Sequence, residues 1–371
     1  MKNVPTERDL HNPPDFSIFF TVLILAGFGL VMVFSASYIT SLETRGDAFF
    51  FLRRQTFWAV LGLVGMLALS NFSYWKWRKL APILLVLNFL LLVAVYIPGV
   101  GVEINEAKRW IGMGSFTIQP SEFSKLALII FTAAFLSKKK INMENFWSSS
   151  FLPLAMLAVT FLLILAQPDL GTSIALAAVI GIIIFAAGIP LKQMAALISI
   201  TIPVFLYLSL SEGYRMRRIF SFLDPWADPL DTGYHIIQSL YALGPGGLFG
   251  VGLGRSRQKL YYLPEPQNDF IFAIIGEELG FLGAVTIMLL FFILFWRGFK
   301  TSLMAPDTFG SLLAAGVTAM VAVQALINIG VVTGSIPVTG INLPFISAGG
   351  SSLFFTMCGM GILMNISRYS R

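Results

Sequence analysis

The chain has 371 residues, of which 56% are hydrophobic and 12% are charged, and its formal net charge is +6. A soluble domain carries roughly 25% charged residues and the mean hydropathy here is +0.80, so the composition excludes a soluble globular enzyme and indicates an integral membrane protein. The single cysteine and the two histidines also exclude an intrachain disulfide and a Cys/His zinc site.

Apolar runs long enough to cross a bilayer, about 17–25 residues each, recur through the chain. The first run follows a polar N-terminus and has no cleavage site after it, so we expect an uncleaved span rather than a signal peptide. The sequence therefore predicts an all-α, polytopic membrane protein that forms a single domain over residues 1–371. Ten spans are expected, at Phe16–Phe34, Gln55–Phe72, Leu80–Ile97, Gln119–Leu136, Phe151–Ala166, Thr172–Ile189, Met194–Leu210, Phe270–Trp296, Leu312–Val332 and Phe345–Ile366.

Lysine and arginine in the short loops set the orientation of a membrane protein. With the N-terminus inside, every inside segment is basic: 75–79, 137–140, 191–192, 296–300 and the tail 367–371. An even number of spans then places both termini in the cytoplasm. The rule is not perfect, because outside loops also carry basic residues. The longest polar segment, 211–269, becomes a large outer loop between the seventh and eighth spans.

Two charged pairs lie around the start of the fourth span. Lys108 and Arg109 precede Trp110, which places cations beside an aromatic ring at the membrane interface, where tryptophan also serves as a simple anchor. Glu122 and Lys125 are three residues apart and share one helix face. Both a structural ion pair at a helix end and a contact to a ligand fit this second pair.

Asp169 lies in the short turn AQPDLGTS between the fifth and sixth spans. An aspartate there suits a turn or a helix N-cap, and a contact to a ligand headgroup is the alternative.

The outer loop 211–269 holds basic residues that suit an anion at the outer surface. The candidates are Arg215, Arg217 and Arg218, and a solvated loop with compensating charges is the alternative. Its glycine-rich part, LGPGGLFGVGLGRSRQK, suits close approach of main-chain amides to a phosphate or a sugar. That part lacks the GK[ST] ending of a P-loop, so no nucleotide site is expected.

Three acids follow at the end of this loop. Asp269 lies at the water–lipid boundary at a helix N-terminus, where the helix dipole favours its charged form and an N-cap is the simple explanation. Glu277 and Glu278 come eight and nine residues later, so we expect them about 12–14 Å deeper. They should face the protein, paired or protonated, in a structural role, with Gln324 and Asn328 as possible polar neighbours.

Six ordered motifs resemble the SEDS family, which contains FtsW, RodA and SpoVE. They are KRWI, IQPSEFSK, AQPDLGTS, DPLDTGYHIIQSLYALGPGGLFGVGLG, LPEPQNDFIFAIIGEELG and LPFISAGGSS, and they cover nearly the whole chain. The segment SRQKLYYLPEPQNDFIFA and the C-terminal tail SRYSR are more similar to FtsW and SpoVE than to RodA. One position departs from the family: Ala348 stands in SAGGS where a tyrosine is common, which puts the role of that position in doubt.

The resemblance implies a peptidoglycan glycosyltransferase that polymerises lipid II at the outer face of the bacterial cytoplasmic membrane. It implies a class B penicillin-binding protein as partner, support by a divalent cation such as Mg²⁺ or Mn²⁺, and no nucleic acid. The family's catalytic aspartate matches Asp269. Its other functional positions match Lys108, Arg109, Glu122, Lys125 and Asp169. Asp269, Asp169 and Glu122 are oxygen ligands that suit such a cation, although no spacing identifies a metal site.

The hypothesis is an inverting transfer in which Asp269 acts as general base on an acceptor hydroxyl. Candidate cations for the leaving pyrophosphate are Lys108, Arg109, Arg215, Arg217 and Arg218. Three alternatives stay open: a lipid II flippase, for which Glu277 and Glu278 are the best argument, a non-catalytic scaffold for division proteins, and another lipid-linked sugar transferase. The motifs do not separate division, elongation and sporulation.

Overall fold

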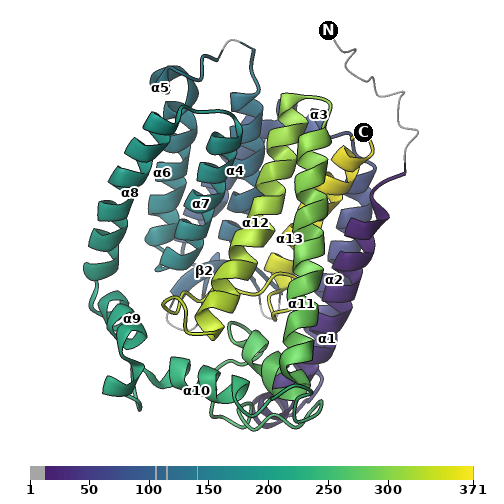
Figure 1. The fold of residues 1–371 in the computed structure, drawn as a ribbon, viewed down its shortest axis with the longest axis vertical. Helices are drawn as coiled ribbons and strands as arrows, with labels where there is room; N and C mark the ends of the chain where they lie inside the picture. Colours follow the sequence, from purple (N-terminus) through teal and green to yellow (C-terminus); the bar gives the residue numbers. More distant parts are fainter. Residues whose placement is uncertain (1–12, 105–106, 114–115, 140, 371) are drawn as a thin grey trace.

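Long helices packed side by side form one bundle in the computed structural model, which describes residues 13–104, 107–113, 116–139 and 141–370 (Figure 1). They are α1 (Phe16–Arg45), α2 (Phe50–Ser70), α3 (Trp75–Ala94), α4 (Pro120–Leu136), α6 (Phe151–Leu165), α7 (Leu170–Ala186), α8 (Leu191–Leu210), α11 (Ile271–Met304), α12 (Thr308–Val332) and α13 (Gly350–Ser367). The polytopic, mainly helical fold is thus confirmed. Each of these helices overlaps one expected span.

Among the described residues, six helices are long and apolar enough to cross a membrane, and α6 and α7 are shorter apolar helices. The count of ten spans therefore stays a prediction. The helices extend beyond some of the expected spans: α1 continues to Arg45 and α11 to Met304. The last helix begins at Gly350, after the irregular start of the segment LPFISAGGSS. Helices can be longer than the apolar runs because the main-chain groups of polar residues outside the hydrocarbon region continue the same helical hydrogen bonds.

The two ends of the described chain lie together. The main-chain N–H of Asp15 donates to Ser367 Oγ at 2.9 Å, and the Asp15 carboxylate pairs with Arg297 of α11 at 2.5 Å. An even number of spans would place both ends on the same side of the membrane, which agrees with this contact. Which side of the membrane this end faces stays a prediction.

The opposite end carries the longest connections, and Figure 1 shows β2, α9 and α10 gathered there. The charge rule predicts that this end faces outside, and we call it the outer end. Its elements are the antiparallel sheet β1 (Gly101–Ile104), β2 (Ala107–Met113) and β3 (Phe116–Ile118), and the short helices α9 (Gly213–Leu223), η2 (Pro225–Ala227) and α10 (Tyr234–Leu243). A further short helix, α5 (Phe146–Ser149), precedes α6.

The small sheet departs from the all-α expectation, although the helices dominate the fold. Its strands pair in the order β1-β2-β3, with Glu103 opposite Lys108 and Ile111 opposite Ile118. Hairpins this short leave almost no alternating pattern in a sequence. Their effect on the fold is to hold Arg109 in a strand rather than in a free loop.

A break in α11 decides where the polar residues of the outer end lie. Gly280 has φ +67° and ψ −164°, so the helix consists of a short part before it and a long part after it. A Cβ atom at Gly280 would lie 2.3 Å from the main-chain nitrogen of Gly250, so only glycine lets the outer loop pass this close. The long part, 281–304, measures about 36 Å and suffices to cross the bilayer without the short part.

Candidate active site

Asp269 lies in the turn that precedes α11, and its main chain is fixed by α12. Its carbonyl oxygen accepts a hydrogen bond from Asn328 Nδ2 at 2.8 Å, and the same amide group donates to the carbonyl of Ile341, also at 2.8 Å. One buried side chain thus ties the Asp269 turn to the segment that leads into α13.

The SAGGS motif braces the same turn from the other side. Ser347 Oγ donates to the carbonyl of Asn268 at 2.7 Å, and the main-chain N–H of Ala348 donates to the carbonyl of Gln267 at 2.8 Å. Gln55 of α2 donates to the carbonyl of Ser347 at 3.0 Å. Because Ala348 contributes a main-chain group to this brace, the missing tyrosine ring leaves the brace intact.

The Asp269 carboxylate itself has few groups around it that stabilise its negative charge. Its side chain is partly buried, and none of the described groups donates a hydrogen bond to its oxygens. Burial, aided by the charges of Glu265 and Asp169, raises the pKa of Asp269 to about 6, against the opposing effects of Arg218 and Arg109. The simpler explanation of Asp269, an N-cap with a dipole-stabilised charge, does not hold, because the N-cap of α11 is Phe270.

Asp169 caps α7. Its Oδ1 accepts from the main-chain N–H of Thr172 at 3.0 Å, and its Oδ2 accepts from Gln119 Nε2 at 3.2 Å. The predicted N-cap is therefore confirmed. The electrostatic effect of Asp169 on Asp269 also places it within the same outer site.

The two basic residues of β2 have different surroundings. Arg109 donates to the carbonyls of Gln167 and Pro168, at 2.9 and 2.5 Å, which holds its guanidinium beside the Asp169 turn. Lys108 is exposed and lies 3.7 Å from Glu103 on the neighbouring strand. Arg109 belongs to the site, whereas Lys108 lies at its rim.

Glu122 and Lys125 form the ion pair that their spacing predicts. The Lys125 Nζ to Glu122 Oε2 distance is 2.7 Å, and both side chains are buried, at 5% and 9% exposure. They lie within the first two turns of α4, just after Gln119. A buried pair of this kind is expensive to break, and its role toward a substrate stays a prediction.

The three arginines of α9 do not act as one group. Arg218 donates to the carbonyl of Val338 at 3.3 Å and influences the charge of Asp269. Arg215 donates to the carbonyl of Leu208, at the end of α8, at 3.1 Å, and Arg217 is exposed. The structure thus brings Arg218 to the site and leaves the other two beside it.

Sequence reasoning missed two site residues. His235 lies in the first turn of α10 and stacks on Phe270 with 5.9 Å between ring centres. Burial together with the charge of Arg218 lowers the pKa of His235. Glu265 influences both His235 and Asp269. Both residues lie inside quoted motifs, GYHIIQ and LPEPQND, but a sequence does not show which motif residues meet.

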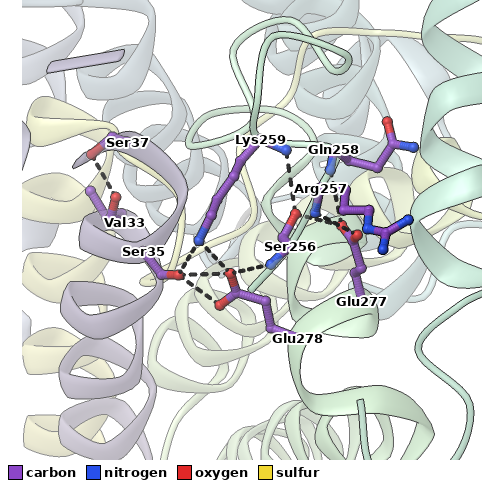
Figure 2. Close-up of polar contacts among 9 residues, drawn as sticks. All are labelled: Val33, Ser35, Ser37, Ser256, Arg257, Gln258, Lys259, Glu277 and Glu278. Carbon is purple, nitrogen blue, oxygen red and sulfur yellow. Dashed lines mark hydrogen bonds and ion pairs between the residues drawn. The ribbon is translucent and has the colours of Figure 1, made fainter. Parts of the chain in front are cut away.

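Glu277 and Glu278 hold the outer loop, and Figure 2 shows how they do so. Glu277 accepts hydrogen bonds from Ser256 Oγ at 2.5 Å and from the main-chain N–H groups of Arg257 and Gln258 at 2.8 and 3.4 Å. Glu278 pairs with Lys259 at 2.8 Å and accepts from Ser35 of α1 at 2.6 Å. We call Glu277, Glu278, Ser256, Lys259 and Ser35 the latch.

The prediction that these acids face the protein interior and are paired is confirmed, whereas the possible neighbours Gln324 and Asn328 are not their hydrogen-bond partners. Their partners come from the outer loop and α1, whereas Asn328 binds the Asp269 turn. The latch lies at the outer end because Ser256 and Lys259 belong to the outer loop.

The glycine-rich segment also has a structural use. The main-chain N–H groups of Val251 and Gly252 donate to the carbonyls of Glu277 and Glu278, at 2.9 and 3.0 Å. A Cβ atom at Gly250 would lie 2.1 Å from the Glu278 carbonyl oxygen. The close main-chain approach in this structure is thus to α11, and an approach to a phosphate or a sugar stays a prediction.

Metal-binding groups are sparse at this end. Within the described ranges, no group of three or more His, Cys, Asp or Glu side chains is arranged to hold a metal ion. Glu122 is paired with Lys125, and Asp169 is used by Gln119 and the start of α7. These residues do not form a protein cage for a cation.

Similar sequences are found along the whole chain. A family model for FtsW, RodA and SpoVE, described as "Cell cycle protein", matches residues 16–371. Stage V sporulation protein E of Bacillus subtilis (strain 168) is 51% identical over 358 residues, 96% of this chain and 98% of that protein. A probable peptidoglycan glycosyltransferase FtsW of Geobacter sp. (strain M18) is 42% identical over 357 residues, 96% of this chain and 97% of that protein.

Two solved structures share the fold. One, described as showing the structural coordination of polymerization and crosslinking by a peptidoglycan synthase complex, contains a chain that matches with a TM-score of 0.78 and 28% identity over 96% of this chain and 98% of that chain. The rod shape determining protein RodA of Thermus thermophilus matches with a TM-score of 0.71 and 28% identity over 96% of this chain and 97% of that chain.

Proposed function

This chain belongs to the FtsW, RodA and SpoVE family of cell cycle proteins, and from that membership we propose that it is a peptidoglycan glycosyltransferase. It polymerises lipid II into glycan strands at the outer face of the bacterial cytoplasmic membrane, with both termini in the cytoplasm. Relatives that carry this activity in their names, at 42% identity over nearly the full chain, support the assignment.

Asp269 carries the catalytic part of the proposal. Its carboxylate is partly accessible, receives no hydrogen bond from the described groups and has a pKa raised to about 6. Such a group is ionised at neutral pH and yet basic enough to accept a proton. In the same region Glu277 and Glu278 are occupied by their donors, so they are poor candidates for a base.

In the proposed step, Asp269 takes the proton of the acceptor sugar's 4-hydroxyl. That oxygen attacks the anomeric carbon of the donor strand, and the bond from this carbon to the pyrophosphate oxygen breaks. Undecaprenyl pyrophosphate leaves with the bonding electron pair, so one displacement inverts the configuration. Arg109 and Arg218 stabilise the charge on the leaving group, with Lys108, Arg215 and Arg217 at the rim and Asp169 and the Glu122–Lys125 pair positioning the substrate.

We also propose two partners for this reaction. A divalent cation, Mg²⁺ or Mn²⁺, would be held by the substrate pyrophosphate rather than by a protein cage, and it would supply positive charge there. A class B penicillin-binding protein crosslinks the product, which the similarity to a chain of a peptidoglycan synthase complex supports.

The flippase alternative loses its main argument. It depended on Glu277 and Glu278 as polar groups on a path through the membrane, and both belong to the latch at the outer end. The scaffold alternative is decided by an activity measurement.

The experiment is polymerisation of lipid II by the purified protein in detergent with a divalent cation, read as glycan strands on a gel, with and without the class B partner. Asp269→Asn is expected to lower the rate by about 10²–10⁴-fold. Asp47→Asn, which changes an outer aspartate that pairs with Arg53, is the matched control and retains the wild-type rate. Normal polymerisation by Asp269→Asn would falsify the assignment of the base.

A further inference from the structure

A cavity lies at the outer end, next to the latch. Its volume is about 680 Å³, and its walls include Arg255, Arg257, Gln258, Glu277 and Tyr241. Small-molecule sites typically have volumes of about 300–1,000 Å³. Asp269 does not line this cavity, so the proposed catalytic step leaves it without a use.

The latch holds one wall of this cavity in a fixed position. Glu277 accepts hydrogen bonds from the main-chain N–H groups of both Arg257 and Gln258. Figure 2 shows the side chains of these two residues directed away from the Lys259–Glu278 pair. The chain between Ser256 and Lys259 is thus anchored from one side and offers its other side chains to the cavity, which limits the entropy lost on binding.

The charges and hydrogen-bonding groups of the walls define the ligand. No described carboxylate forms an ion pair with Arg255 or Arg257, and the Glu277 oxygens are occupied by the latch. Gln258 Oε1 is buried, and none of the described groups donates to it. The cavity therefore offers the guanidinium groups of Arg255 and Arg257 and the Gln258 oxygen as an acceptor for an N–H group. It also has an apolar wall that contains Tyr241 and Val251. A phosphate has no N–H to offer, whereas a peptide with a free carboxylate matches all three.

The position of the cavity relative to Asp269 suits a peptide attached to the reacting sugars. α10 begins beside Asp269, where His235 stacks on Phe270, and its other end lines the cavity with Tyr241 and Gly244. Six to nine helical residues span about 9–14 Å. An extended peptide covers this distance with roughly three or four residues at about 3.3–3.6 Å each.

We propose that this cavity binds the carboxylate-bearing peptide stem of a lipid II unit, with Arg255 and Arg257 on the carboxylate and Gln258 on a peptide N–H. The proposal rests on the proposed function, because it takes the disaccharide-peptide as substrate. It makes Arg255, Arg257 and Gln258 determinants of substrate specificity rather than catalytic residues.

Binding to the full chain in detergent tests the proposal without requiring turnover. The probe is the soluble disaccharide-pentapeptide, which lacks lipid and pyrophosphate, beside the same molecule with its carboxylates amidated. The wild type is expected to bind the free-carboxylate form at least about tenfold more tightly. Arg255→Gln/Arg257→Gln is expected to bind both forms equally and weakly, and Arg255→Lys/Arg257→Lys to recover part of the preference.

Controls separate this inference from the proposed function. Arg53→Gln, which changes an exposed outer arginine outside the cavity, retains the wild-type preference. Asp269→Asn also retains it while polymerisation is lost, so a failure to polymerise in the wild type would remove the proposed function and leave the cavity assignment standing. Equal binding of both probes by the wild type, or a preference that survives in Arg255→Gln/Arg257→Gln, would overturn the cavity assignment.

Discussion

Glu277 and Glu278 of the latch lie only eight and nine residues after Asp269 in the chain, but the surroundings of the carboxylates are opposite in the two regions. Glu277 and Glu278 accept hydrogen bonds from main-chain amides, two hydroxyl groups and one ammonium. The Asp269 carboxylate receives none from the described groups, and its pKa is raised to about 6. Satisfied carboxylates hold the outer loop in place, and the unsatisfied one is left available for chemistry.

The physical reason is the cost of removing a charge from water. A buried carboxylate without donors loses several kcal/mol of hydration and responds by binding a proton more tightly. Donors offset that loss at the latch. At Asp269 the two nearby arginines are opposed by Glu265 and Asp169, so the loss remains and keeps the group basic.

The largest expected effect on stability comes from removing a charge at the latch. Lys259→Met leaves Glu278 buried without its cation, and we expect the free energy of unfolding to fall by about 3–5 kcal/mol. Thermal unfolding in detergent measures this. The double change Lys259→Met/Glu278→Leu removes both charges and is expected to recover most of the loss. A Lys259→Met protein as stable as the wild type would show that the latch does not hold the loop.

At Asp269 the expected stability effect has the opposite sign. Folding raises the pKa of this carboxyl from its ordinary value of 3.8 to about 6, so the folded state binds the proton more tightly. The group therefore favours folding below about pH 4, and this contribution is lost as the pH rises through 6. Asp269→Asn is expected to raise the free energy of unfolding by about 1–3 kcal/mol at pH 7.5 and to change it little at pH 4. Unfolding curves at both pH values check this, and a loss of stability at pH 7.5 would contradict it.

The smallest expected effect is a shift in the pH dependence of polymerisation, which tests how the charges around Asp269 set its pKa. We expect kcat/KM for lipid II polymerisation to rise with pH through about 6, because the base must be ionised. Glu265→Gln removes a charge that raises the pKa and shifts this limb to lower pH, whereas Arg218→Gln shifts it to higher pH. Rate profiles between pH 4.5 and 8 for the three proteins, on the ~1 unit scale of such shifts, provide the measurement. A limb that stays fixed in both variants would assign it to another group.

The amino-acid sequence by itself determined the class of fold and the family. Long apolar runs require helices because the bilayer offers no partner to an unpaired main-chain group, so the helices could be predicted from composition and length. The ion pair of Glu122 and Lys125 and the N-cap of Asp169 were also predictable, because each depends on residues a few positions apart.

Only the tertiary structure decided which distant residues meet. Ser35 and Glu278 are separated by 243 positions and Asn328 and Asp269 by 59, and no local pattern encodes such contacts. The break at Gly280 lets the glycine-rich segment pass close to the start of α11, where Glu277 and Glu278 bind the outer loop, because a single positive φ redirects a helix. This packing gives Glu277 and Glu278 their hydrogen-bond donors and leaves the Asp269 carboxylate without one among the described groups. The different roles that we assign to these carboxylates follow from that difference.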